Sequence, residues 1–146
     1  MKADDIDYES VFRNLPAPVM VLSPDFRIID SNSAHRALSG KSREELIGQS
    51  VFDAFPDNPS EPGVSGTGNL GESLRRVMDT GRPDAMALQR YDVEILEKPG
   101  AFEERYWCPL NVPVHRPDGA VDYIIHLVEE VPELIRKFVD AESAGA

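Results

Sequence analysis

The sequence has little of what several protein classes require. Cys108 is its only cysteine, which excludes an internal disulfide and a zinc cluster built on cysteines. No apolar run approaches the ~20 residues that cross a bilayer. The opening stretch MKADDIDYES is acidic and polar, unlike a secretory signal peptide. These absences predict a protein of the reducing cytoplasm that does not enter a membrane.

Positive charge is scarce as well. The chain has 15 Lys and Arg against 26 Asp and Glu, and its net charge is −11. Binding nucleic acid requires clustered basic residues that neutralise phosphates, and an anionic membrane surface would repel this chain. We therefore expect neither as a partner and interpret the acidity as a source of solubility.

Histidine is limited to His35, His115 and His126. Their spacing matches no metal site, so we expect no bound metal. We interpret His35 as a half-buried core residue. His115 lies beside a turn sequence, and we expect it to be exposed.

The first half of the chain predicts a hairpin followed by short helices. Apolar residues at helical spacing indicate an amphipathic helix before Pro16. Strands Val19–Leu22 and Arg27–Ser31 flank a Ser-Pro-Asp turn. The next two helices begin after the capping residues Asn32 and Ser42.

The second half predicts one longer helix and then strands. A breaker-rich loop, PDNPSEPGVSGTG, precedes the amphipathic stretch LGESLRRVMDTG. Three long strand candidates follow, Ala85–Leu96, Glu103–Val114 and Ala120–Val131, and a short apolar stripe closes the chain in VPELIRKFVDAES. This order predicts an α+β domain with five antiparallel strands, short helices on one face, and a flanking helix at each end.

Two stretches carry the most specific pattern of this sequence. The first, LPAPVMVLSPDFRIIDSNSAHRALSGKSREELIGQSVFDAFP, combines a hairpin, an asparagine-capped helix and a following helix pair, and it resembles the opening of the PAS sensor domain family. VHRPDGAVDYIIHLVEEVPE is similar to its final hairpin and exit motif, from which Pro132 departs. The resemblance covers nearly the whole chain. It implies a PAS domain over residues 16–131, an N-terminal helix over 1–15, and a signalling helix or linker over 132–146.

The resemblance also implies a small cavity between sheet and helices where a ligand would bind. The flavin branch of the family needs a cysteine in the helix near SVFDAF, and the haem branch uses a histidine of the long helix. Neither residue is present, which argues against a flavin–cysteine photoadduct and against a haem held in that way. A haem with another axial ligand stays open, and the cofactor is unknown.

Strand alternation predicts the cavity lining. It places Ile124, His126 and Val128 on one face, and matching the ending to the family turns this face toward the cavity. The same matching turns Arg105, Trp107 and Asn111 inward. The sequence does not fix which residues of LQRYDV face the cavity. From this segment, Gln89 and Tyr91 are included among the predicted lining residues.

Several of these residues have two readings. His126 is either a ligand-binding or pH-sensing residue, or a core histidine with a polar neighbour. Trp107 either stacks on a flat ligand or simply fills the cavity. Asn111 suits a polar edge of a ligand, and Arg105 suits a ligand carboxylate or an internal acid such as Asp92.

The opposite sheet face is also apolar and needs a cover. A helix of the same chain or of a partner chain can supply it, and the terminal stripe can continue as a coiled coil. We therefore expect a homodimer, with its contacts among the following residues: Val11, Phe12, Leu15, Tyr123, Ile125, Leu127, Leu134, Ile135 and Phe138.

The leading hypothesis is a sensory module of a bacterial signal-transduction protein, for example the input domain of a sensor histidine kinase in a two-component system. Its output domain would act in cis or in trans. The alternative is a ligand-free PAS module for protein–protein interaction and dimerisation. A small enzyme is a distant alternative, because no spacing unites a nucleophile, a base and an orienting group. GVSGTGNLG also lacks the lysine and preceding strand of a phosphate-binding loop.

Overall fold

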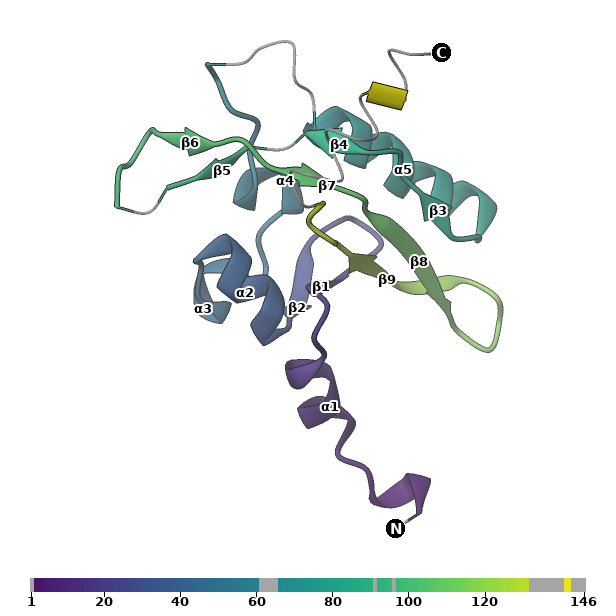
Figure 1. The fold of residues 1–146 in the computed structure, drawn as a ribbon. Helices are drawn as coiled ribbons and strands as arrows, with labels where there is room; N and C mark the ends of the chain where they lie inside the picture. Colours follow the sequence, from purple (N-terminus) through teal and green to yellow (C-terminus); the bar gives the residue numbers. More distant parts are fainter. Residues whose placement is uncertain (1, 61–65, 91, 96, 132–140, 143–146) are drawn as a thin grey trace.

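The structure, a computed structural model, describes residues 2–60, 66–90, 92–95, 97–131 and 141–142. One antiparallel sheet of five strands carries helices on one face, which confirms the predicted α+β class (Figure 1). The chain opens with the short 3-10 turn η1 (Ala3–Asp5) and helix α1 (Tyr8–Asn14). Helix α1 contacts α2 (Ser33–Ser39) and projects from the rest of the domain (Figure 1).

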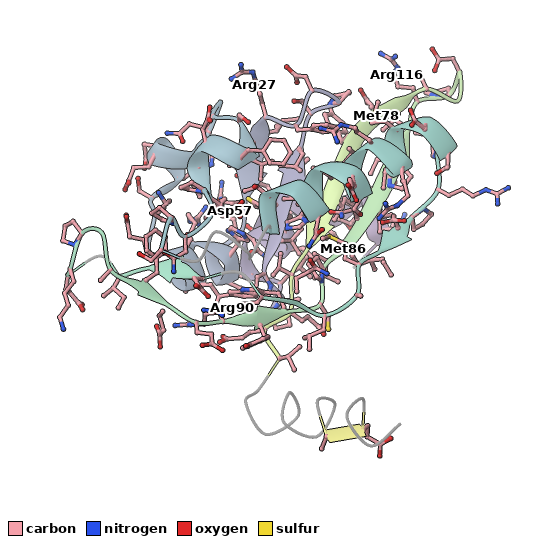
Figure 2. The ribbon with its side chains drawn as sticks, turned by 90° about the horizontal axis from the view of Figure 1, so that it is seen from above. Arg27, Asp57, Met78, Met86, Arg90 and Arg116 are labelled. Atoms are coloured by element: carbon pink, nitrogen blue, oxygen red, sulfur yellow. The ribbon has the colours of Figure 1, made fainter. Side chains whose placement is uncertain are left out.

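The first hairpin joins β1 (Val19–Leu22) to β2 (Ile28–Ser31). Its turn is closed by the backbone N–H of Ser23, which donates to the carbonyl of Arg27 at 2.9 Å. The second strand begins one residue later than the sequence predicts, because Arg27 forms an isolated bridge with Ser50. The side chain of Arg27, like that of Arg116, extends from the edge of the domain (Figure 2).

Capping residues set the starts of the short helices. The Asn32 side chain accepts from the N–H of His35 at 3.0 Å, and α2 ends at Gly40, whose φ of 69° is left-handed. Helix α3 (Arg43–Leu46) begins with the capping box of Ser42 and Glu45. Helix α4 (Val51–Ala54) follows after one more cap.

Helix α5 (Gly66–Thr80) starts earlier than predicted. The sequence assigns the residues through Gly68 to the preceding loop. The reason is a distant cap. The carboxylate of Asp57 accepts from the N–H of Thr67 at 3.0 Å and from its hydroxyl at 2.6 Å. These bonds satisfy donors at the first turn, so two glycines are held in a helix that they disfavour.

The five-stranded sheet has the order β2-β1-β9-β8-β3. Its two longest strands, β8 (Leu110–His115) and β9 (Val121–Leu127), form the predicted closing hairpin. Gly119 turns this hairpin with a φ of 89°, a conformation that favours glycine. The edge strand β3 (Asp84–Ala85) pairs only with β8.

The long strands predicted over Ala85–Leu96 and Glu103–Val114 are broken, which corrects the prediction. Beyond β3 and β8 they form two separate ladders of two-residue strands: β4 (Gln89–Arg90) with β7 (Tyr106–Trp107), and β5 (Val93–Glu94) with β6 (Phe102–Glu103). Pro109 has no N–H for a ladder. The N–H of Cys108 instead donates to the carbonyl of Glu129, so this segment crosses over the end of β9.

The core lies between the inner face of the sheet and the helices. Met20, Leu22, Ile28 and Ile124 supply the sheet side. The helix side comes from α3, α4 and α5 through Leu46, Val51, Ala54, Leu74 and Val77. Leu70 and Met78 pack against this cluster, so the predicted apolar face of the long helix does point into the core.

The predicted C-terminal helix, with Leu134, Ile135 and Phe138, lies outside the described residues. The boundaries at residues 15/16 and 131/132 therefore stay predictions. Among the described residues, no helix combines the length and apolar character that a bilayer span requires.

Candidate ligand-binding cavity

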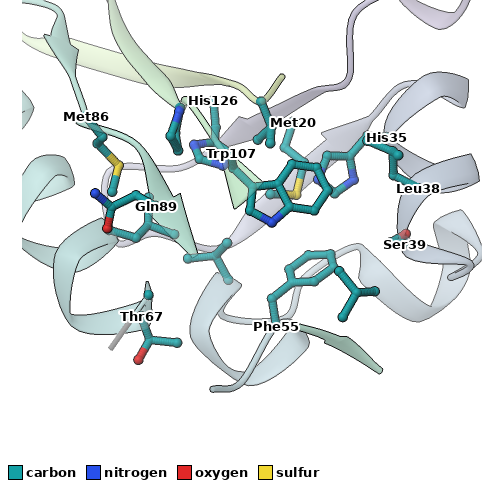
Figure 3. Close-up of a pocket in the computed structure, with 16 residues that line it drawn as sticks. Met20, His35, Leu38, Ser39, Phe55, Thr67, Met86, Gln89, Trp107 and His126 are labelled. Carbon is teal, nitrogen blue, oxygen red and sulfur yellow. The ribbon is translucent and has the colours of Figure 1, made fainter. Parts of the chain in front are cut away.

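A cavity lies between the inner sheet face and the helices, next to the core. About 100 Å³ of it is open to the centres of water-sized molecules. Its walls come from β1, α2, α4, α5, β4, β5, β7 and β9, and the close-up shows the indole of Trp107 among His35, Phe55 and His126 (Figure 3). The lining is Met20, His35, Leu38, Ser39, Val51, Phe55, Gly66, Thr67, Leu70, Met86, Gln89, Val93, Trp107, Pro109, His126 and Val128.

His126 enters the cavity wall from β9, and its ring is held from behind. Its Nδ1 lies 2.6 Å from Oδ1 of Asn111 on the neighbouring strand β8, where the two residues are register partners. His126 is 5% exposed. Burial away from water lowers the pKa of His126 to about 3, and the neighbouring His35 adds to this shift. The ring is therefore neutral at physiological pH.

A chain of hydrogen bonds continues from Asn111 to the surface. The amide Nδ2 of Asn111 donates to Oγ of Ser73 at 2.9 Å. Ser73, on α5, donates to Oδ2 of Asp84 at 2.5 Å. The guanidinium of Arg76 binds both oxygens of Asp84 at 3.0 Å. These bonds, from Arg76 first, lower the pKa of Asp84, so its carboxylate is charged at neutral pH.

His35 enters the cavity wall from α2 and has no such support. It is 7% exposed, and its Nδ1 is a buried atom without a hydrogen-bond partner. Its ring packs against Phe55 edge to face, with ring centres 5.4 Å apart. Burial, assisted by the charge of Arg36, lowers the pKa of His35 to about 4. A buried polar atom that is left unpaired costs stability, so this one calls for an explanation.

Other polar side chains of the lining are already bonded within the protein. Ser39 donates to the carbonyl of Arg36, and Thr67 donates to Asp57. The amide of Gln89 donates to the carbonyl of Ala87 and accepts from Asn69. Hydrogen-bonding capacity for a bound molecule is thus concentrated on the two histidines.

The buried carboxylate of Asp92 joins two segments beside the cavity. It accepts from Asn58 at 2.8 Å and from Nε of Arg90 at 3.0 Å. Asn58 follows α4, whereas Asp92 and Arg90 belong to the segment of β4 and β5. The hydrogen bond from Asn58 therefore ties the segment after α4 to the short strands beside the cavity.

The structure brings together four of the predicted lining residues: Gln89, Trp107, His126 and Val128. Asn111 lies one layer behind the wall, where it supports His126. Ile124 packs in the core. Arg105 points elsewhere, because its guanidinium pairs with Glu103 at 2.9 Å and with Glu130 at 3.1 Å. Tyr91 lies outside the described residues.

Sequence reasoning missed the contribution of the helices to the lining. His35 was expected to be a half-buried core residue, but it is buried and borders the cavity. Its spacing from Leu38 and Ser39 is that of one helix face, which is the signal that could have found it. Phe55 and Met86 stand in irregular segments and gave no such signal. His115 is exposed, as expected.

Within the described ranges, no group of three or more His, Cys, Asp or Glu side chains is placed to hold a metal ion. Cys108 is exposed and lies in neither the cavity lining nor α4.

The comparisons with known proteins agree with this architecture. A family model described as "PAS fold" matches residues 12–136. The chain belongs to the PAS family. PAS domains are sensory modules of signalling proteins and are generally not catalytic. A curated relative, the uncharacterized protein y4lL of Sinorhizobium fredii, is 35% identical over 52 residues, which are 36% of this chain. That match spans only 6% of the length of y4lL.

Solved structures share the fold at low identity. The PAS domain of a Colwellia psychrerythraea protein has a TM-score of 0.65 at 15% identity and covers 85% of this chain and 93% of its own. A sensory box sensor histidine kinase from Vibrio cholerae has a TM-score of 0.58 at 15% identity, and the match covers 86% of this chain and 90% of the kinase chain. VqmA bound to DPO has a TM-score of 0.61 at 18% identity and covers 86% of this chain and 57% of VqmA.

Proposed function

We propose that this PAS domain senses a small molecule, which binds in the cavity between the sheet and the helices. One observation carries the proposal: the cavity is open, and two buried histidines in its wall keep ring nitrogens without protein partners. A concave, mostly apolar site with a few converging polar groups is the usual form of a small-molecule site.

The alternative, a ligand-free interaction module, predicts a filled cavity. Trp107 is large enough to fill much of the space, yet it lies in the wall at 7% exposure and leaves about 100 Å³ open. An interaction module would gain stability if larger side chains closed this space, because cavities cost free energy. The open volume therefore favours the sensory reading.

The role of this domain within a larger signalling protein is inferred from its structural relatives. One structural relative is a sensory box sensor histidine kinase, and another is VqmA bound to DPO. By analogy, we propose that residues 16–131 are an input domain flanked by an N-terminal helix over 1–15 and a signalling segment over 132–146. The output domain would act in cis or in trans, in the cytoplasm of a bacterium, and this domain itself would have no catalytic activity.

Native mass spectrometry of freshly purified protein, with an absorption spectrum of the same sample, tests the sensory function. We expect a reproducible extra mass that is lost on denaturation. Trp107→Ala and His126→Ala should reduce its occupancy, whereas His115→Ala, at an exposed position, should not. If no extra mass appears and no compound of a metabolite library raises the melting temperature, the sensory proposal fails and the interaction module stands.

We also propose that the domain forms a homodimer through the outer face of its sheet. Strand pairing gathers apolar residues there, and in the part of the chain that the structure describes no helix packs closely on β9; we call them the outer-face patch: Val21, Val112, Val114, Tyr123, Ile125 and Leu127. Tyr123 is 41% exposed. Val11 on α1 is 46% exposed, and Leu15, directly after this helix, is exposed too. The predicted contacts Val11, Leu15 and Tyr123 therefore remain available to a second copy.

Light scattering after size-exclusion chromatography tests the dimer. Tyr123→Lys places a charge in the outer-face patch and should shift the protein toward monomer. Arg116→Glu, a charge change in the exposed turn of the same hairpin, is the control. A wild-type protein that stays monomeric at 100-fold dilution and at high concentration alike would contradict the proposal.

A further inference from the structure

Given a ligand in this cavity, as proposed above, we infer its chemical class: a small, uncharged, largely apolar molecule that donates one hydrogen bond to Nε2 of His126. Three features of the site support this ligand class: the absence of charge in the described lining, the direction of the hydrogen bonds behind His126, and the size of the open space.

The first feature is charge. The described residues that line the cavity include no Asp, Glu, Lys or Arg. The two histidines are buried away from counter-charges, so they are neutral. A charged group that entered this site would lose its hydration without gaining an opposite charge, which is costly. Carboxylates, phosphates and ammonium groups are therefore excluded as the part of the ligand that lies inside.

The second feature is the hydrogen-bond chain, whose direction is set at the surface. The carboxylate of Asp84 can only accept, so the hydroxyl of Ser73 must donate its single hydrogen to Asp84. The Ser73 oxygen then accepts from the amide Nδ2 of Asn111 at 2.9 Å. This bond fixes the orientation of the Asn111 amide, and its Oδ1 faces His126.

The orientation of Asn111 in turn fixes the tautomer of His126. Oδ1 of Asn111 is an acceptor, so the hydrogen of the neutral ring must lie on Nδ1, 2.6 Å away. Nε2 therefore carries a lone pair and can only accept. Since the ring borders the cavity and Nδ1 is occupied, Nε2 is the atom that remains for a bound molecule. A ligand that meets it must bring an N–H or O–H donor.

The third feature is size. The open space of about 100 Å³ limits the bound part of the ligand to a small molecule. The surrounding side chains are aliphatic, thioether and aromatic, with Phe55 and Trp107 as flat surfaces. They suit a flat, apolar molecule. His35, whose Nδ1 has no partner, offers a second polar contact.

Three probes separate these requirements. 3-Methylindole and 1-methylindole are isomers of equal size, but only the first has an N–H donor. Indole-3-carboxylate keeps the donor and adds a charge. Binding of each to the full 146-residue chain is followed by ¹H–¹⁵N NMR titration. We expect 3-methylindole to bind at the cavity at least about fivefold more tightly than 1-methylindole, and indole-3-carboxylate not to bind.

The outcomes distinguish this inference from the sensory function. Equal affinity of the two isomers, or tighter binding of the carboxylate, overturns the ligand class while the cavity remains a binding site. The absence of binding by all three probes also overturns the class. The sensory function is decided separately by the copurified mass, and a charged copurified ligand seated in the cavity would overturn the class alone.

Ser73 is a positioning residue, because its hydroxyl orients the amide of Asn111 and thereby the tautomer of His126. The variant Ser73→Ala tests this role. Without the hydroxyl, the Asn111 amide can turn and both tautomers of His126 become accessible. The preference for 3-methylindole over 1-methylindole should then fall toward equality. Thr80→Ala, on the same helix, is the control: its hydroxyl bonds only backbone groups of Arg76 and Arg82 and no side chain of the hydrogen-bond series, so this variant should keep the preference.

A spectroscopic measurement makes the test independent of affinity. Long-range ¹H–¹⁵N spectra report which ring nitrogen of His126 is protonated. We expect Nδ1 protonated and Nε2 free in the wild type and in Thr80→Ala, and a mixture in Ser73→Ala. A wild-type ring that carries its proton on Nε2 would overturn the inference.

Discussion

The inner and outer faces of the β8–β9 hairpin come from alternate residues of the same two strands. Unusually, the buried inner face carries polar side chains, whereas the more exposed outer face is apolar. The inner face is buried and carries polar side chains, Asn111 and His126, beside Ile124 and Val128. The outer face is apolar, with Val114 and Tyr123 exposed. A domain selected only for stability as a monomer would show the opposite arrangement.

Each face therefore points to a molecule outside the monomer. The inner face keeps a hydrogen-bonded histidine at the wall of an open cavity, which suits a small ligand. The outer face presents apolar surface in a strand pair, which suits a second copy of the chain. Four predictions test how far the inner side of the sheet, together with the helix residues that face it, differs from the outer face.

The largest expected effect comes from acidifying the inner face. The unfolded chain protonates its histidines near pH 6.5, but the folded pKa of His35 is about 4 and that of His126 about 3. The unfolded state thus binds more protons as the pH falls below 6.5, and stability is lost. From pH 7.5 to pH 5 the two residues together should cost roughly 4 kcal/mol of unfolding free energy.

Urea unfolding across this pH range measures the loss. His35→Phe should remove about half of it. Asp84 adds a separate loss only in more acidic solution, because its pKa is lowered and its stabilising bonds disappear once the carboxylate is protonated. A stability that is flat between pH 7.5 and pH 5 would contradict the burial of neutral histidines.

The next comparison uses two neighbouring isoleucines on opposite faces. Ile124 is 0% exposed in the core cluster, whereas Ile125 is only half-buried in the outer-face patch. Ile124→Ala should destabilise the domain by about 2–5 kcal/mol, because it removes buried surface and leaves a cavity. Ile125→Ala should cost the monomer about 1 kcal/mol or less. Equal costs measured by urea unfolding would show that the two faces are equally buried.

A smaller effect is expected from Asn111→Leu. This change leaves Nδ1 of His126 and the hydroxyl of Ser73 without the partner that they have now. We expect a loss of about 1–3 kcal/mol. The double variant Asn111→Leu with His126→Leu removes both partners of the Asn111–His126 hydrogen bond. Its loss of unfolding free energy should therefore be smaller than the sum of the losses in the two single variants. Strict additivity would show that the bond between them contributes nothing.

Local chemistry made much of this fold predictable. The cap at Asn32, the capping box at Ser42 and the turns at Gly40 and Gly119 depend on residues a few positions apart. Alternation along β9 also separated the two faces correctly, because Ile124 and His126 are buried on one face while Tyr123 is exposed on the other. Such features can be read from a single sequence since neighbouring residues decide them.

Contacts between distant segments could not be predicted. The start of α5 depends on Asp57, and the orientation of His126 depends on Ser73, which lies 38 residues before Asn111. The long strand candidates failed for the same reason, because Cys108 and Trp107 pair with residues after β9 rather than continuing β8. The polar half of the cavity is built from these long-range contacts, so the sequence indicated its members but not their connections.

The smallest effect is expected at His35, and it has the opposite sign. Phenylalanine there would keep the edge-to-face contact with Phe55 and remove a buried nitrogen that has no partner. Because the residue borders open space, the slightly larger ring can be accommodated. His35→Phe should therefore stabilise the domain by about 1 kcal/mol at pH 7.5, measured by urea unfolding. If the change instead destabilises the protein, His35 has a structural partner, and the inner face is polar for stability rather than for a ligand.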